Sequence, residues 1–96
     1  MTESLKAFEQ LLGLSEAMLG AAERQDWEAL ASIEAERRGL SGSLPDTASS
    51  QLASAEQARA RRLIEACLLC DKRIQPLVST RMNELRVLLR EAPAGA

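Results

Sequence analysis

The residues most able to do chemistry are the two cysteines, Cys67 and Cys70, in the stretch ACLLC. A Cys-x-x-Cys spacing can hold a metal ion or cycle between a dithiol and a disulfide. A zinc site needs four ligands, however, and the chain has no histidine and no other cysteine. A thioredoxin-like pair opens a helix after a strand, whereas this pair falls inside a leucine-rich helical pattern. We therefore expect both thiols to pack as small apolar groups, with a metal shared across a dimer as the alternative.

Other catalytic arrangements are missing from the sequence. There is no histidine base, no glycine-rich phosphate loop and no nucleophile with a partner at a recognisable spacing. We expect neither an enzyme nor a cofactor. The 12 basic and 14 acidic residues give a net charge of −2, without the concentrated basic face that nucleic-acid binding needs. Nucleic acid is therefore not an expected partner.

The composition indicates a small helical protein of the cytoplasm. Leucine and alanine dominate the hydrophobic residues, which make up 46% of the 96 residues, and both favour helices. The length suits a single domain. No apolar run approaches the ~20 residues of a membrane span, and the first residues, MTESLKAFEQ, do not resemble a signal peptide. We predict an all-α domain over residues 1–96, cytoplasmic and without membrane insertion.

Apolar residues repeat at helical spacing in three segments, which predicts an antiparallel up-down-up bundle. We expect helices at about residues 2–23, 27–40 and 51–91 and a loop at 41–50, with Thr2 and Asp26 as N-caps. Pro76 predicts a kink in the long third helix. The start of that helix has Leu52 as its only large apolar residue, which predicts a solvated or fraying lead-in.

Each predicted helix has one apolar face. The first face carries Leu5, Phe8, Leu12, Ser15, Leu19 and Ala22, and the second carries Trp27, Leu30, Ile33, Arg37 and Leu40. The third carries Leu63, Cys67, Cys70, Ile74, Leu77, Val78, Leu85, Leu88 and Leu89. The second helix, about 20 Å long, is too short to cover the groove between its longer neighbours. Part of the apolar surface should therefore stay open to a partner.

Several charged and apolar residues allow more than one interpretation. Arg81 lies near the centre of the third apolar face, so it must reach water or pair with Glu34 or Glu84. The run that contains Glu34, Glu36, Arg37 and Arg38 is typical of a solvated helix face. Leu69 and Val87 fall on the back of the third helix, either as isolated exposed side chains or as a second contact surface.

Two blocks of the chain resemble the FliT-type flagellar export chaperones. The first is AMLGAAERQDWEALASIEAERRGL, residues 17–40, which is similar to a family helix-turn-helix whose second helix starts with Trp-acidic-x-Leu. The second is KRIQPLVSTRMNELRVLL, residues 72–89, with the family's Arg-Met-acidic-Glu-Leu segment at positions 81–85. Asn83 replaces the usual acidic residue there, and Pro76 is a further departure.

The resemblance implies a cytosolic chaperone for the flagellar filament-cap protein. Such a chaperone binds the C-terminal segment of its client, prevents premature assembly and helps deliver the client to the export apparatus. Relatives also dock on components of the export ATPase complex, and some restrain a flagellar transcription regulator. In those relatives a fourth helix folds over the client groove. This sequence, which ends at Ala96, leaves no room for it, so we expect an open groove.

The predicted client groove combines both lines of reasoning. Its expected apolar residues are Trp27, Leu30, Leu77, Val78, Leu85, Leu88 and Leu89, and its expected polar edge is Glu34, Arg81 and Glu84. Such a surface suits an amphipathic helical segment of a partner. A helical adaptor or homodimer that buries the same surface against itself is the alternative. Trp27 is expected mainly to fix the position of the second helix, between the first and the third.

Overall fold

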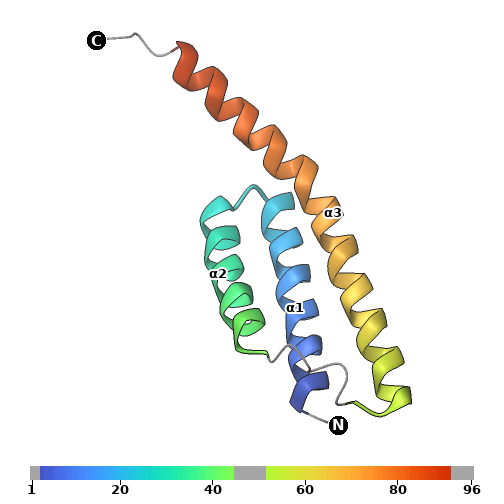
Figure 1. Cartoon of the computed structure of the whole chain (residues 1–96). Coiled ribbons are helices and arrows are strands. Elements are labelled where there is room, and N and C mark those ends of the chain that lie inside the picture. The colour runs from blue at the N-terminus through green and yellow to red at the C-terminus, as the bar shows by residue number, and fades with distance from the viewer. Residues whose placement is uncertain (1–2, 45–51, 92–96) are drawn as a thin grey trace.

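The computed structural model describes residues 3–44 and 52–91, and these residues form three helices. They are α1 (Glu3–Glu23), α2 (Trp27–Ser43) and α3 (Ser54–Glu91). The chain runs up α1, down α2 and up α3, so the predicted all-α, up-down-up order is confirmed (Figure 1). Thr2 and most of the predicted loop at 41–50 lie outside the described residues.

Two predicted helix boundaries are wrong by about one turn. α2 ends at Ser43 and not near residue 40, and α3 starts at Ser54 and not near residue 51. Gly39 and Gly42 lie near the predicted end of α2, where a left-handed glycine often ends a helix. Neither has the left-handed backbone of a helix terminus, and the helix continues through both. Glycine in a helix costs only about 1 kcal/mol, which the packing of neighbouring residues can offset.

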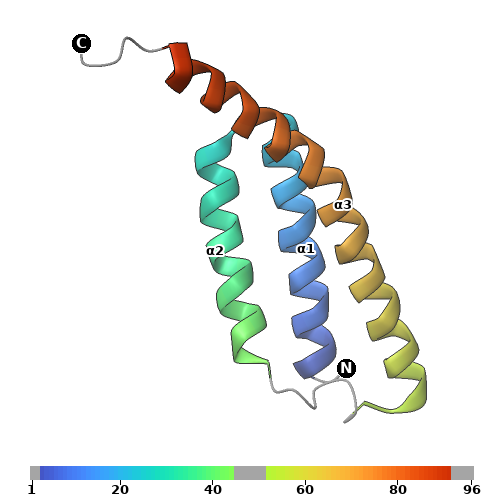
Figure 2. The same ribbon diagram turned by 45° about the horizontal axis from the view of Figure 1, so that its top comes forward.

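α1 is the central helix of the bundle. It packs against both α2 and α3, whereas no described Cα atom of α2 lies within 8 Å of one in α3. Both views show α1 between the other two helices (Figures 1 and 2). α2 and α3 therefore flank α1 on two sides, and any contact between α2 and α3 is made by side chains.

The turn between α1 and α2 is built from local hydrogen bonds. Gln25 has a positive φ of 60°, and its N–H donates to the carbonyl of Ala22 at 3.1 Å. The N–H of Asp26 donates to the carbonyl of Ala21 at 2.8 Å, which completes a Schellman-type helix end. The Asp26 carboxylate then accepts from the N–H of Ala29 at 3.1 Å and caps α2, as the sequence predicts.

The lower part of the core joins α1 to the start of α3. Its buried members are Leu5, Phe8, Leu52 and Ala60, with Leu11, Leu44 and Leu63 packed against them. The predicted solvated lead-in is thus only partly wrong: most residues from 53 to 62 are exposed, but Leu52 is 5% exposed and Ala60 is 1% exposed. The segment is also held by Gln57, whose side-chain amide donates to the Leu52 carbonyl at 2.8 Å.

The upper part of the core is formed around the second half of α1. Its buried side chains are Met18, Ala21, Ala22, Cys70 and Ile74. Cys70 packs as the small apolar group that the sequence predicts, and burial, followed by the nearby Glu16 carboxylate, raises the pKa of its thiol. Cys67 is half-buried, and neither cysteine forms a disulfide.

α3 continues as a single helix through Pro76 and extends past the ends of its neighbours (Figures 1 and 2). In Figure 2 its upper half leans over the top of α1 and α2. The last turns of α3 therefore have no helix beside them. We call this part, residues 82–90, the overhang. Its exposed apolar side chains are Met82, Val87, Leu88 and Leu89, which are 48–77% exposed.

Candidate functional site

A groove of about 510 Å³ lies between α2 and α3, with α1 as its floor. The floor is formed by Phe8, Leu11 and Ser15, which are spaced by one helical turn or slightly less. The α3 wall is formed by Ile64, Cys67 and Leu68. The α2 wall is formed by Glu34, Arg37, Arg38, Ser41 and Gly42. The groove thus has an apolar floor and one apolar wall, and its other wall is polar.

The α3 wall exposes apolar surface to solvent. Ile64 is 40% exposed and Leu68 is 55% exposed, although both line the groove. Phe8, at the floor, is 8% exposed and holds the base of the groove in the lower core. Gly42 in the opposite wall has no side chain, and no atom lies within 4 Å of the place where its β-carbon would stand. At this position the wall is formed by backbone alone.

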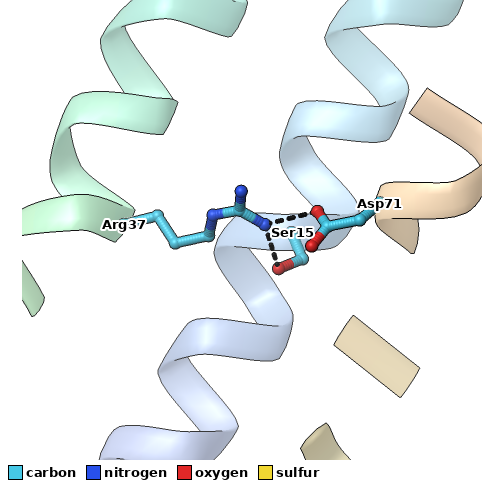
Figure 3. A network of polar contacts seen from close by, with 3 residues as sticks. All are labelled: Ser15, Arg37 and Asp71. Carbon is cyan, nitrogen blue, oxygen red and sulfur yellow. Dashed lines mark hydrogen bonds and ion pairs between the residues drawn. The ribbon is translucent and has the colours of Figure 1, made fainter. Parts of the chain in front are cut away.

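One polar network crosses from α2 to α3 over the middle of α1 (Figure 3). The Nη1 group of Arg37 donates to the Oδ1 atom of Asp71 at 2.7 Å and to the Oγ atom of Ser15 at 3.2 Å. Ser15 is fully buried, so this bond satisfies a hydroxyl that water cannot reach. The network joins all three helices, and two of its members, Ser15 and Arg37, also line the groove.

Sequence reasoning missed this network. It assigned Arg37 to a solvated face, but the arginine side chain is 25% exposed and pairs with a residue 34 positions away. A signal was present, because Ser15 and Arg37 are the polar members of two otherwise apolar helix faces. Nothing in the helical pattern singled out Asp71, since helical periodicity does not show which residues of two helices lie at the same height.

The predicted polar edge is only partly assembled. Glu34 does not reach Arg81; it pairs within α2 with Arg38, whose Nη2 group lies 2.6 Å from Oε2. Glu84 does pair with Arg81, with Nη1 and Oε2 3.6 Å apart. Arg38 lies four residues from Glu34, one turn along the same helix, whereas Arg81 lies over Trp27, which is seven residues or about two turns of α2 away from Glu34.

Trp27 lies against α3 near the top of the bundle. The Cζ atom of Arg81 is 6.0 Å from the centroid of its ring, within the range of a cation–π contact. A small cavity of about 110 Å³ beside the ring is lined by Ala22 of α1 and by Leu77, Thr80 and Glu84 of α3, among others. The half-buried ring stands where α1 ends and α3 continues, but α2 does not lie between α1 and α3 as expected, because α1 is the central helix.

The other residues of the predicted client groove are divided between two places. Leu30, Leu77 and Val78 are half-buried within the bundle, whereas the overhang carries Leu85, which is half-buried, and Leu88 and Leu89, which are 60% and 77% exposed. None of these six lines the groove over α1. Leu88 and Leu89 are exposed because α1 and α2 end before them.

The predicted second surface is also divided. Val87 borders the same shallow hollow as Leu88, with Thr80, Asn83 and Glu84, so it belongs to the overhang. Leu69 lies below the overhang, is 59% exposed and lines no hollow described above. The two residues that sequence reasoning grouped therefore do not mark one site.

The described residues contain neither a helix that could span a membrane nor a cluster of three or more possible metal ligands. None of its helices combines the length and the apolar character needed to cross a bilayer. Within residues 3–44 and 52–91, no three His, Cys, Asp or Glu side chains come together as metal ligands. Fold and groove define a small three-helix protein with an open groove that has an apolar floor, one apolar wall and one polar wall.

The family comparison is specific. The model of the family described as flagellar protein FliT matches residues 5–95, and the chain belongs to this family. The match includes both blocks, residues 17–40 and 72–89, that carry the sequence resemblance. Comparison with curated proteins and with solved structures finds no match to this chain.

Proposed function

We propose that this flagellar protein is a cytoplasmic export chaperone that binds the C-terminal segment of the filament-cap protein. It would keep that segment from assembling early and help deliver it to the export apparatus. Membership of the FliT family supports a flagellar role. The finer assignment rests on the resemblance and on the surface described above, which suits a binding protein better than an enzyme.

The observation that carries the proposal is the open groove over α1. The two outer helices do not approach each other, and a groove of about 510 Å³ lies between them. Phe8, Leu11, Ile64 and Leu68 present apolar surface in it, which favours an amphipathic segment with its apolar face inward. The exposed leucines of the overhang would extend the contact along α3.

The test is calorimetric titration of the full chain with a peptide of the cap protein's C-terminal segment. Leu68→Ser places a polar group in the groove wall at a site that is 55% exposed, so the fold should persist. We expect it to weaken binding about tenfold or more, because a central apolar contact of an interface commonly contributes over 1 kcal/mol. Leu88→Ser tests the overhang in the same way.

Leu69→Ser is the matched control. It removes a leucine of similar exposure, 59%, next in sequence to Leu68 but outside the groove. Unchanged affinity in both Leu68→Ser and Leu88→Ser, with helicity intact, would contradict the groove assignment. No binding by the unmodified chain would contradict the chaperone proposal itself.

Self-association through the overhang is a second candidate. The apolar side chains at Met82, Val87, Leu88 and Leu89 lie on turns of α3 with no neighbouring helix, so a second copy could cover them. Sedimentation of the unmodified chain and of Leu88→Ser separates the two candidates. A concentration-dependent dimer lost in Leu88→Ser, with no affinity for cap-protein peptides, would favour an adaptor role. Export ATPase components and a flagellar transcription regulator are further proposed partners, to be tested by the same titration.

A further inference from the structure

We infer that Arg37 selects the client by binding a carboxylate on the apolar face of the client's helical segment. The inference rests on the proposed function and names the feature that the groove recognises. It follows from the way in which Arg37 is held. Only one of its three nitrogens, Nη1, is used by Asp71 and Ser15.

The other edge of the guanidinium is unoccupied. Neither Nε nor Nη2 of Arg37 has a hydrogen-bond partner among the described residues, and neither is buried without one. Together Nε–H and Nη2–H form a planar pair of donors that matches the two oxygens of a carboxylate. Figure 3 shows Nη1 turned toward Ser15 and Asp71 while the other terminal nitrogen points away from both.

The contacts on one edge of the Arg37 guanidinium hold the other edge in position for a ligand. A free arginine loses side-chain entropy when it binds a ligand, but the contacts with Asp71 and Ser15 already hold this guanidinium at the groove. The neighbouring Arg38 differs, because Glu34 of its own helix already binds its Nη2 group, so its Nε and Nη2 groups are not both available to a client carboxylate. Of the two arginines in this wall, Arg37 is therefore the one whose Nε–H and Nη2–H groups are both available to a carboxylate.

The position of Arg37 predicts where the carboxylate lies. The floor runs from Phe8 to Ser15, about 10 Å or two turns of helix, and Arg37 marks the Ser15 end. A client helix in the groove would place apolar residues over Phe8 and Leu11 and an Asp or Glu one to two turns away, at the end of the same face. An acidic residue on an otherwise apolar face is the expected sequence mark of the client segment.

The experiment is a double-mutant cycle read by calorimetry. Each Asp or Glu of the cap-protein segment is changed in turn to Asn or Gln, and each peptide is titrated against the unmodified chain and against Arg37→Lys. Lysine keeps the positive charge beside Asp71 but cannot present two parallel donors. We expect one neutralised peptide to bind the unmodified chain about tenfold more weakly than the parent peptide does. Arg37→Lys should lower the affinity for the parent peptide by a similar factor and leave the affinity for that neutralised peptide unchanged.

Arg38→Lys is the matched control, and its affinity should stay within about twofold because Glu34 already occupies Arg38. Equal affinity of all neutralised peptides for the unmodified chain overturns the inference and leaves the chaperone proposal intact. That arm needs no protein variant, so it decides the question even if Arg37→Lys does not fold. Failure of the parent peptide to bind the unmodified chain overturns the proposed function and, with it, this inference.

Discussion

The guanidinium of Arg81 lies over the ring of Trp27, with Cζ 6.0 Å from the ring centroid. This contact joins the first turn of α2 to α3 although the two helices keep their Cα atoms more than 8 Å apart. Lower down, the contact of Arg37 with Asp71 makes a second join between the same helices. The groove lies open beside this second contact. Its boundaries are therefore set by side-chain contacts between α2 and α3 and not by close packing of the two helices.

Trp27→Ala should lower the free energy of unfolding by about 2 kcal/mol. A fully buried tryptophan costs more, but this ring is half-buried and its loss also removes the Arg81 contact. Urea unfolding followed by circular dichroism measures the change. Trp27→Phe keeps part of the packing and should lose less. A loss below about 0.5 kcal/mol in Trp27→Ala would show that the ring does not hold α2 in place.

Gln25→Gly should raise the stability of the chain by up to about 1 kcal/mol. Gln25 has φ of 60°, a left-handed conformation that is strained for a residue with a β-carbon and natural for glycine. The added freedom of glycine in the unfolded chain offsets part of the gain. Thermal unfolding reads the effect as a higher midpoint. Gln25→Ala, which keeps the β-carbon, is the control and should give no such increase.

Leu52→Ala should lower the free energy of unfolding by about 2–4 kcal/mol, because Leu52 is buried against the lower core. Leu69→Ala removes the same atoms from a side chain that is 59% exposed and should change stability by less than about 0.5 kcal/mol. Urea unfolding of both variants gives the comparison. Equal effects would mean that the segment before α3 is not packed as described.

The two thiols should react with iodoacetamide at different rates. Burial raises the pKa of the Cys70 thiol, so at pH 8 less of it is the reactive thiolate, and its side chain is also shielded. Raising the pH increases the thiolate fraction, so the rate at Cys70 should still be rising at pH 9. Cys67→Ala and Cys70→Ala each leave one thiol for mass spectrometry. Faster modification of Cys70 than of Cys67 would contradict its burial.

Local features were predictable because their partners are near in sequence. Asp26 and the N–H group of Ala29 lie in one turn, so the capping residue of α2 could be identified without knowledge of the rest of the chain. The all-α class and the order of the helices follow from composition and helical period. The residues around Trp27 and Arg81 also pointed to the family that the family model shows.

The groove needed the tertiary structure. Ser15, Arg37 and Asp71 come from three different helices, and the period of each helix says which face is apolar but not which residues share a height. The burial of Leu52 likewise depends on its contact with α1. Leu88 and Leu89 continue the apolar face of α3 in sequence, yet they are exposed because α1 ends at Glu23 and α2 begins at Trp27. Sequence alone determined the helices and their apolar faces, and only the packing decided where those faces stay uncovered.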